Sequence, residues 1–106
     1  MIGSGWRRAL MGLAAMPLLA SLTGCGNAFY AVYANGATNK LEEAKELGAE
    51  EYASYEYWMA REYLVKARSE AAEADYSDAI SLAKESREFS EKAIGLARAA
   101  HRGAGR

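Results

Sequence analysis

The chain has very few of the residues that usually form disulfides, metal sites and tight turns. Among 106 residues it contains one cysteine, one histidine and one proline. A single cysteine cannot form an internal disulfide, and a structural zinc site needs several Cys or His ligands. The one histidine, His101, stands near the C-terminal end, where we expect a solvated side chain that favours the helix dipole.

Other absences narrow the classes of function. The formal net charge is −1, so the chain has no excess of positive charge to hold the phosphates of a nucleic acid. The sequence shows no pairing of a nucleophile with a base, no glycine loop for phosphate and no spacing of metal ligands. We therefore expect no enzymatic activity, no metal, no cofactor and no small-molecule substrate.

The first 24 residues have the pattern of an export signal. Arg7 and Arg8 give a positive start, and an apolar run follows from residue 9 to residue 22, interrupted only by Pro17 and Ser21. That run is shorter than the roughly 20 residues that a membrane span needs, and it carries a proline. Residues 1–24 are thus predicted to be a cleaved signal peptide. The alternative is an uncleaved signal anchor.

The only cysteine follows this run in a pattern that resembles the bacterial lipobox. Leu22, Thr23 and Gly24 supply an aliphatic residue and two small ones immediately before Cys25. The resemblance implies that the Cys25 thiol receives a diacylglycerol, that the chain is cut before Cys25, and that the new amine is acylated. Two or three acyl chains anchor a protein durably in a membrane. The alternative is an ordinary free cysteine after a cleaved signal.

The residue after the cysteine bears on location. In lipoprotein sorting as known for enteric bacteria, Asp at this place favours retention in the inner membrane, and this chain has Gly26 instead. By that resemblance, we expect a lipid-anchored protein of the bacterial envelope, at the outer membrane and facing the periplasm.

The rest of the chain has the composition and periodicity of helices. Apolar residues make up 51% of the chain, a share inflated by alanine, so the core must be thin. A stripe at helical spacing starts at Tyr57, with Ser54 as a candidate cap, and a second stripe follows a cap at Asp75. The first stripe holds Tyr57, Ala60, Leu64, Ala67, Ala71 and Ala74. The second holds Ala79, Leu82/Ala83, Ser86, Phe89/Ser90, Ala93, Leu96/Ala97 and Ala100.

A third, shorter helix is expected before these two. Ala34, Ala37, Leu41, Ala44 and Leu47 keep helical spacing, Gly48 is a plausible stop, and the helix starts either near Phe29 or at Asn39. Residues 25–36 are accordingly either a tether or the first turns. We predict an all-α domain over residues 37–102, with 103–106 as a flexible tail. Its fold would be an up-down-up three-helix bundle, or a helical hairpin plus a shorter N-terminal helix.

Four short pieces of the chain, taken in order, resemble a known family. They are Gly48-Ala49 with Tyr52-Ala53, then Ala60-Arg61-Glu62 with Leu64, then Ala67-Arg68, then Asp75-Tyr76 with Ala79, Leu82 and Ala83. Residues 48–93 are similar to the Ala-rich domain of unknown function 4398 of Gram-negative envelope lipoproteins, and "ADYSDAISLAKES" resembles half of a tetratricopeptide repeat. The family usually has Pro where Ser54 stands and Gly where Ala74 stands. If residue 74 needs a positive φ, alanine there costs about 1 kcal/mol.

One aromatic group is a candidate contact surface. Five rings fall within 12 residues, and they are Tyr52, Tyr55, Tyr57, Trp58 and Tyr63. Tyr57 lies on the core stripe, whereas Tyr55 and Trp58 share the adjacent face, where such side chains often bind partners. The alternative is that the rings cover the end of the first helix and compensate for the small alanines of the core.

These patterns together favour a non-catalytic adaptor or structural subunit of the envelope, acting through helix-face contacts with another protein. One alternative is a structural protein that associates with itself, and another is a helical protein held by an uncleaved signal anchor.

Overall fold

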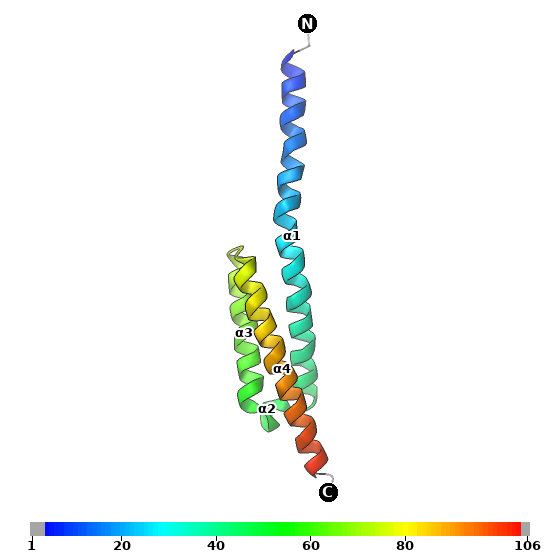
Figure 1. Cartoon of the computed structure of the whole chain (residues 1–106), viewed down its shortest axis with the longest axis vertical. Coiled ribbons are helices and arrows are strands. Elements are labelled where there is room, and N and C mark those ends of the chain that lie inside the picture. Colours follow the sequence, from blue (N-terminus) through cyan, green and yellow to red (C-terminus); the bar gives the residue numbers. More distant parts are fainter. Residues whose placement is uncertain (1–3, 105–106) are drawn as a thin grey trace.

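The computed structural model describes residues 4–104, with side chains described for residues 25–104. All four elements in this part of the chain are helices. They are α1 (Ser4–Glu46), α2 (Ala49–Tyr52), α3 (Ser54–Ala72) and α4 (Tyr76–Ala104). As Figure 1 shows, α1 runs down the molecule, α3 runs back up and α4 runs down again. The predicted all-α fold with up-down-up order is confirmed.

The first helix differs from the prediction. α1 spans 43 residues, so it is the longest helix and not a shorter one. It passes through both predicted starts, Phe29 and Asn39, and through Gly36, so Asn39 does not cap it. A glycine inside a helix costs only about 1 kcal/mol, which the packing of the surrounding turns against α4 can offset. Within the described residues no helix is long and apolar enough to cross a membrane.

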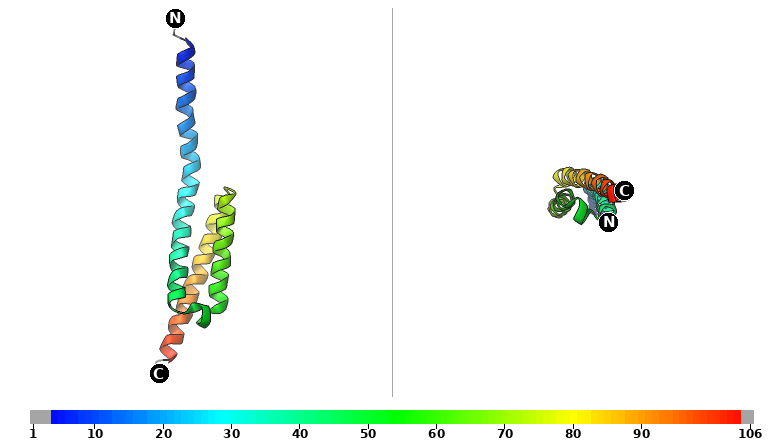
Figure 2. Two further views of the ribbon diagram at one scale, coloured as in Figure 1. Left: turned by 180° about the vertical axis from the view of Figure 1, so that it is seen from behind. Right: turned by 90° about the horizontal axis from the view of Figure 1, so that it is seen from below.

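α4 lies between the other two long helices and packs along both of them, whereas α1 and α3 meet each other over a smaller surface. The end-on view in Figure 2 shows this arrangement, with the one-turn α2 near α3. The buried apolar side chains are mostly alanines, which let the helix backbones approach closely. They are Ala37, Ala44, Ala49, Ala53, Ala60, Ala67, Ala79, Ala83, Ala93 and Ala97, with Tyr57, Leu64 and Ile94.

The two predicted stripes form the α3–α4 interface for most of their length. Along α4, Ser86 and Ser90 are fully buried among the alanines. The Ser86 hydroxyl donates a hydrogen bond to the Ala60 carbonyl across the interface at 2.7 Å, and Ser90 donates to the Ser86 carbonyl at 2.9 Å. Because both hydroxyls have acceptors, these serines fit a dry interface without an unsatisfied polar group. Buried Ile94 was missing from the predicted stripe.

The helix ends agree with the prediction at two places and not at a third. Gly48 follows α1 with φ 79°, and the Asp75 carboxylate accepts the Asp78 N–H at 3.3 Å as the cap of α4. Asp78 does not return this bond, since the Asp75 N–H donates to the Glu70 carbonyl instead. The cap predicted at Ser54 is wrong. Ala53 occupies the N-cap of α3, and the Ser54 hydroxyl donates to the Glu50 carbonyl at 2.7 Å.

Ala74 ends the first stripe early because α3 stops at Ala72. Ala74 has φ 61°, the left-handed conformation for which glycine is suited. Its N–H donates to the Ala71 carbonyl at 3.0 Å, and the Asp75 N–H donates to the Glu70 carbonyl at 2.9 Å. These two bonds form a Schellman motif, so the turn keeps its usual geometry with alanine in the glycine position.

The C-terminal end of α4 contacts the turn between α1 and α2. His101 Nε2 lies 2.7 Å from the Leu47 carbonyl, to which it donates, and its ring meets Tyr52 edge-on at 5.0 Å. His101 therefore satisfies a carbonyl group left free at the end of α1. The sequence predicts only a solvated side chain at this position. α4 continues to Ala104, so the predicted tail at 103–106 begins as helix, while residues 105–106 lie outside the described part.

Candidate functional site

The predicted lipidation site lies on the surface. Cys25 is exposed on α1. The lipobox residues Leu22, Thr23 and Gly24 belong to the helical backbone of α1, but their side chains lie outside the described part of the chain. The accessible thiol is compatible with modification, and it is held by a regular helix.

Helix α1 meets α4 directly after this cysteine. A Cβ atom on Gly26 would lie 2.9 Å from Cδ2 of Tyr76, so only glycine leaves room for the tyrosine ring. The Tyr30 ring follows one turn later, 6.4 Å from the Tyr76 ring. Of the two predictions for residues 25–36, the tether is wrong and the helix start is right. Gly26 therefore has a packing role at the start of the described side chains.

The aromatic residues do not form one patch. Tyr57 is 3% exposed and belongs to the core, whereas Tyr63 stacks on Phe89 of α4 with ring centroids 5.6 Å apart. Tyr52 packs on His101, as described above. The remaining two candidates, Tyr55 and Trp58, are 66% and 46% exposed. The alternative prediction, that the rings cover the end of the first helix, describes two of them. Tyr57 packs in one cluster with Ala44, and the Tyr52 ring lies against Gly48 directly after α1. Tyr55 and Tyr63 instead contact Phe89 of α4.

Tyr55 and Trp58 line a shallow hollow on the outer side of α3. Its volume is about 280 Å³, and the side chains around it belong to Ser54, Tyr55, Trp58, Met59 and Glu62. Tyr55 leans edge-on against Phe89 at 6.3 Å, and the Arg61 guanidinium lies 5.3 Å from the Trp58 ring centroid. Both rings thus contact neighbouring side chains while part of each ring stays exposed.

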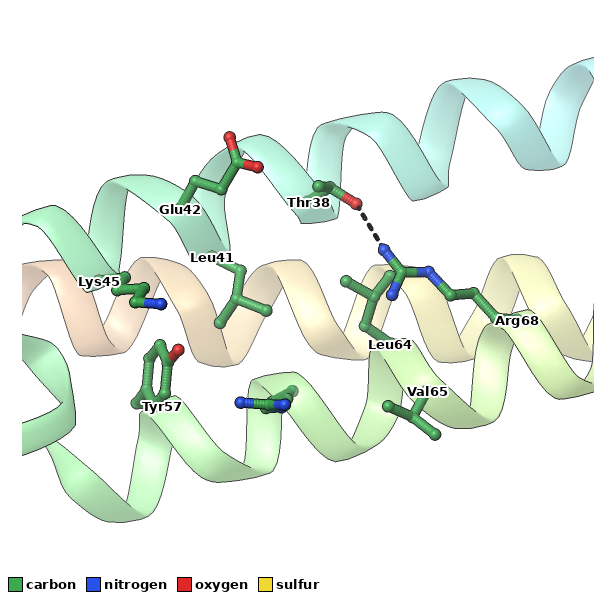
Figure 3. Close-up of a pocket in the computed structure, with 9 residues that line it drawn as sticks. Thr38, Leu41, Glu42, Lys45, Tyr57, Leu64, Val65 and Arg68 are labelled. Atoms are coloured by element: carbon green, nitrogen blue, oxygen red, sulfur yellow. Dashed lines mark hydrogen bonds between the residues drawn. The ribbon is translucent and has the colours of Figure 1, made fainter.

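A second hollow lies between α1 and α3, at residues that the sequence analysis does not predict as a site. Figure 3 shows Leu41 of α1 and Tyr57 and Leu64 of α3 pointing into it, and its volume is about 270 Å³. Three cations surround this apolar floor, Lys45, Arg61 and Arg68, against the single carboxylate of Glu42. The Arg68 guanidinium reaches across the hollow to within 3.5 Å of the Thr38 hydroxyl.

The sequence could not indicate this hollow because its rim residues look like an ordinary solvated helix face. Arg61, Val65 and Arg68 recur at spacings of four and three on α3, a pattern that is visible in the sequence. Whether such a row faces water or a neighbouring helix depends on how far α1 and α3 stand apart. That distance is set by α4, which packs against both.

Among the residues whose side chains the structure describes, Tyr57 is the one whose pKa shows a clear shift. Burial of the ring raises the pKa of Tyr57 above 10.0, and the Glu50 carboxylate raises it further, while Arg61 acts in the opposite direction. The tyrosine consequently stays neutral at the floor of the hollow, where it can donate or accept a hydrogen bond.

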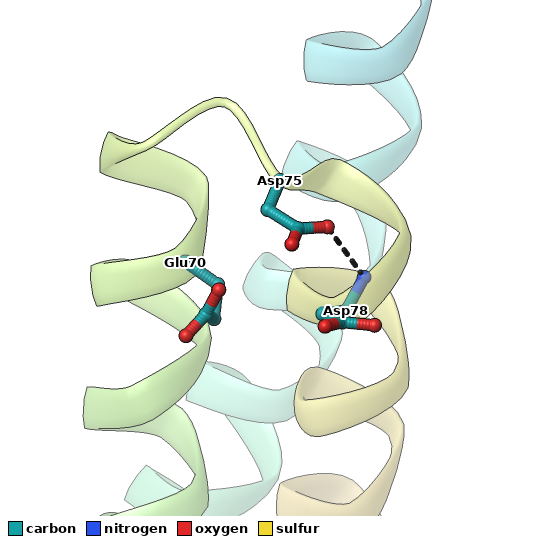
Figure 4. A group of neighbouring side chains, drawn as sticks. All are labelled: Glu70, Asp75 and Asp78. Carbon is teal, nitrogen blue, oxygen red and sulfur yellow. Dashed lines mark hydrogen bonds between the residues drawn. The ribbon is translucent and has the colours of Figure 1, made fainter.

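Three carboxylates gather at the turn between α3 and α4. Figure 4 shows Glu70, Asp75 and Asp78, whose oxygens can lie within 4.8 Å of one another. Asp75 and Asp78 are exposed, and Asp75 is engaged as the helix cap. The N-terminal end of α4 attracts negative charge, which accounts for the two aspartates without a bound ion.

Comparison with known proteins adds one finding. The family model described as "Domain of unknown function (DUF4398)" matches residues 33–104, from the second half of α1 to the end of α4. No curated protein and no solved structure matches the chain.

Proposed function

We propose that this chain, which belongs to the family of domains of unknown function DUF4398, is a lipid-anchored envelope protein that acts as a non-catalytic adaptor. In this proposal a diacylglycerol and an N-acyl chain on Cys25 hold the bundle at the outer membrane, facing the periplasm. Its helix faces then bind another envelope protein. The observation that supports the anchor is an exposed Cys25 directly after residues that have the pattern of an export signal and resemble a lipobox.

The mechanism is binding from a fixed position. An anchor confines the domain to one surface, which raises its effective concentration for a partner on the same surface. The bundle suits this task because Gly26 contacts Tyr76 immediately after the anchored residue, so the helices follow the anchor closely. Two surfaces support the adaptor role: the Tyr55–Trp58 hollow, and the α1–α3 hollow with its three cations.

The anchor is tested by membrane fractionation of cells that express the wild-type chain or Cys25→Ala. We expect the wild type in the outer-membrane fraction, resistant to extraction by salt and soluble in detergent. The variant should leave that fraction. If Cys25→Ala stays with the membrane to the same extent, the anchor is not at Cys25 and the uncleaved signal anchor becomes the better account.

The adaptor role is tested by placing a photo-crosslinking amino acid at Trp58, at Val65 or, as control, at Ala99. All three positions are exposed, and Ala99 lies outside both hollows. The proposal expects one crosslinked partner from position 58 or 65 and none from 99. A crosslink to a second copy of the chain would favour the self-associating structural protein instead. Absence of any crosslink at 58 and 65 would contradict both.

A further inference from the structure

The outer face of α1 next to Cys25 exposes apolar side chains that nothing in the described part of the chain covers. Phe29 is 64% exposed and Val32 is 69% exposed. Cys25, Phe29 and Val32 stand at positions i, i+4 and i+7, so they share one face of the helix. The face that packs on α4 through Gly26 lies about 100° further around the helix, and its Ala37 is fully buried.

This part of α1 also lacks charge. No Asp, Glu, Lys or Arg occurs between Cys25 and Asn39, although charged residues make up 25% of the whole chain. The first charged side chain after the cysteine is Lys40, which pairs with Glu43 at 3.4 Å. Exposed apolar side chains without charged neighbours mark a surface that contacts something other than water.

The opposite charge pattern lies across the bundle. Tyr76 contacts Gly26, so the α3–α4 turn stands level with the start of the anchored domain along α1. Glu70, Asp75 and Asp78 gather at this turn. If the bundle stood upright on its anchor, these carboxylates would face the lipid phosphates and the anionic headgroups of the membrane, which repel them. Tilting the bundle onto the outer face of α1 would lift the carboxylates away.

We propose that the outer face of α1 from Cys25 to Val32 is a lipid-contact surface. This inference rests on the proposed anchor at Cys25. The acyl chains on Cys25 enter the bilayer, and Phe29 and Val32 lie in the boundary between headgroups and acyl chains. The bundle leans on this face, which neither α3 nor α4 covers at Phe29 and Val32. Val32 lies about 10 Å beyond Cys25 along the helix axis. Because the interfacial zone is shallow, both residues can lie in it only if the helix is tilted.

The experiment compares two labelled positions by their distances from the lipid headgroups. The proposed leaning bundle and an upright bundle predict opposite orders of these distances. Cys25 is the only cysteine, and lipidation consumes its thiol, so a second cysteine is the only free thiol of the anchored protein. Val32→Cys places it on the proposed surface. Ser77→Cys places it on exposed Ser77, next to the tyrosine that touches Gly26. An upright bundle brings residue 77 nearer to the headgroups than residue 32, and a leaning bundle does the opposite.

Each variant is extracted from cell membranes, and its intact mass is measured to establish the lipid on Cys25. It is then labelled with an environment-sensitive fluorophore and reconstituted in vesicles of phosphatidylethanolamine and phosphatidylglycerol. Part of the lipid carries a nitroxide at the headgroup, which quenches the label at short range. Circular dichroism checks that both labelled variants keep the helical content of the wild type.

We expect quenching at position 32 to exceed quenching at position 77 by about threefold, as for a helix face in the interfacial zone. Equal quenching, or stronger quenching at 77, would overturn the lipid-contact surface and leave the anchor intact. Label self-quenching at position 32 that depends on protein density would also overturn it, because a second copy would then cover this face. An unlipidated mass would overturn the proposed function itself.

Discussion

Ala74 adopts a left-handed backbone conformation that costs most residues free energy, and it does so at the turn between α3 and α4. We expect Ala74→Gly to raise the free energy of unfolding by about 1 kcal/mol, because glycine has no Cβ to strain at φ 61°. For a domain of this size the midpoint of thermal unfolding should rise by about 4–8 °C.

The matched control for this change is Ala72→Gly in the last turn of α3. Glycine in a regular helix lowers stability by roughly 0.5–1 kcal/mol, so the two alanine-to-glycine changes should have opposite signs. A loss of stability in Ala74→Gly would contradict the strained conformation of residue 74.

Tyr57 gives the chain a predicted response to alkaline pH. Because the pKa of Tyr57 is raised in the folded state, mainly by burial, the unfolded chain loses this proton at a lower pH than the folded chain. The contribution of Tyr57 to stability is complete below pH 10.0 and is lost as pH rises through its folded pKa. Urea unfolding at increasing pH should show stability falling above about pH 10, with a smaller fall in Tyr57→Phe. Equal falls in the two proteins would contradict this account.

The sequence predicted some residue-level details and missed others for a common reason. Asp75 was correctly expected as a cap, and the strain at Ala74 followed from the comparison with glycine in the family. Ser54 was expected to cap α3, but α2 brings the Glu50 carbonyl close enough to accept its hydroxyl. Cap positions depend on the backbone angles of the preceding turn, and a list of residue types does not give those angles.

At the level of helices, the α3–α4 interface depends on side chains no larger than alanine or serine along most of its length. Ala83 is fully buried there. We expect Ala83→Leu to lower the free energy of unfolding by about 1–3 kcal/mol, because the added carbons must push the two backbones apart. Chemical unfolding followed by circular dichroism measures this change.

The same substitution at an exposed position provides the control. Ala99 lies on the solvent side of α4, and Ala99→Leu should change stability by less than about 0.5 kcal/mol. Similar losses at both positions would mean that the close approach of α3 and α4 does not depend on Ala83.

The periodicity of the sequence gave the helices more reliably than their limits. Alanine and serine at spacings of three and four identified the buried faces of α3 and α4, since that pattern follows from 3.6 residues per turn. The start of α1 was left open between residues 29 and 39, because Gly36 weakens the local preference for helix. α1 begins before both residues, at Ser4, and its turn with Gly26 and Tyr30 packs against Tyr76, a contact between residues far apart in the sequence.

At the level of the whole molecule, the two ends of the bundle carry different structural features. One end carries Cys25, the uncharged face of α1 and the acidic turn between α3 and α4. The other end carries the α1–α2 turn, which His101 ties to α4. The sequence alone predicts the proposed anchor, because the patterns that resemble a signal and a lipobox are local. The α1–α3 hollow could not be predicted, because it arises from the placement of three helices that α4 holds together.

The central claim is that lipid on Cys25 places this bundle at a membrane. Intact-mass measurement of the membrane-extracted protein from its native cell, beside a Cys25→Ala variant, tests it most directly. The account predicts a mature chain that begins at Cys25 and carries the added mass of a diacylglycerol and an N-acyl chain, and no such species in the variant. A full-length chain, or a cleaved chain with an unmodified Cys25, would contradict the claim.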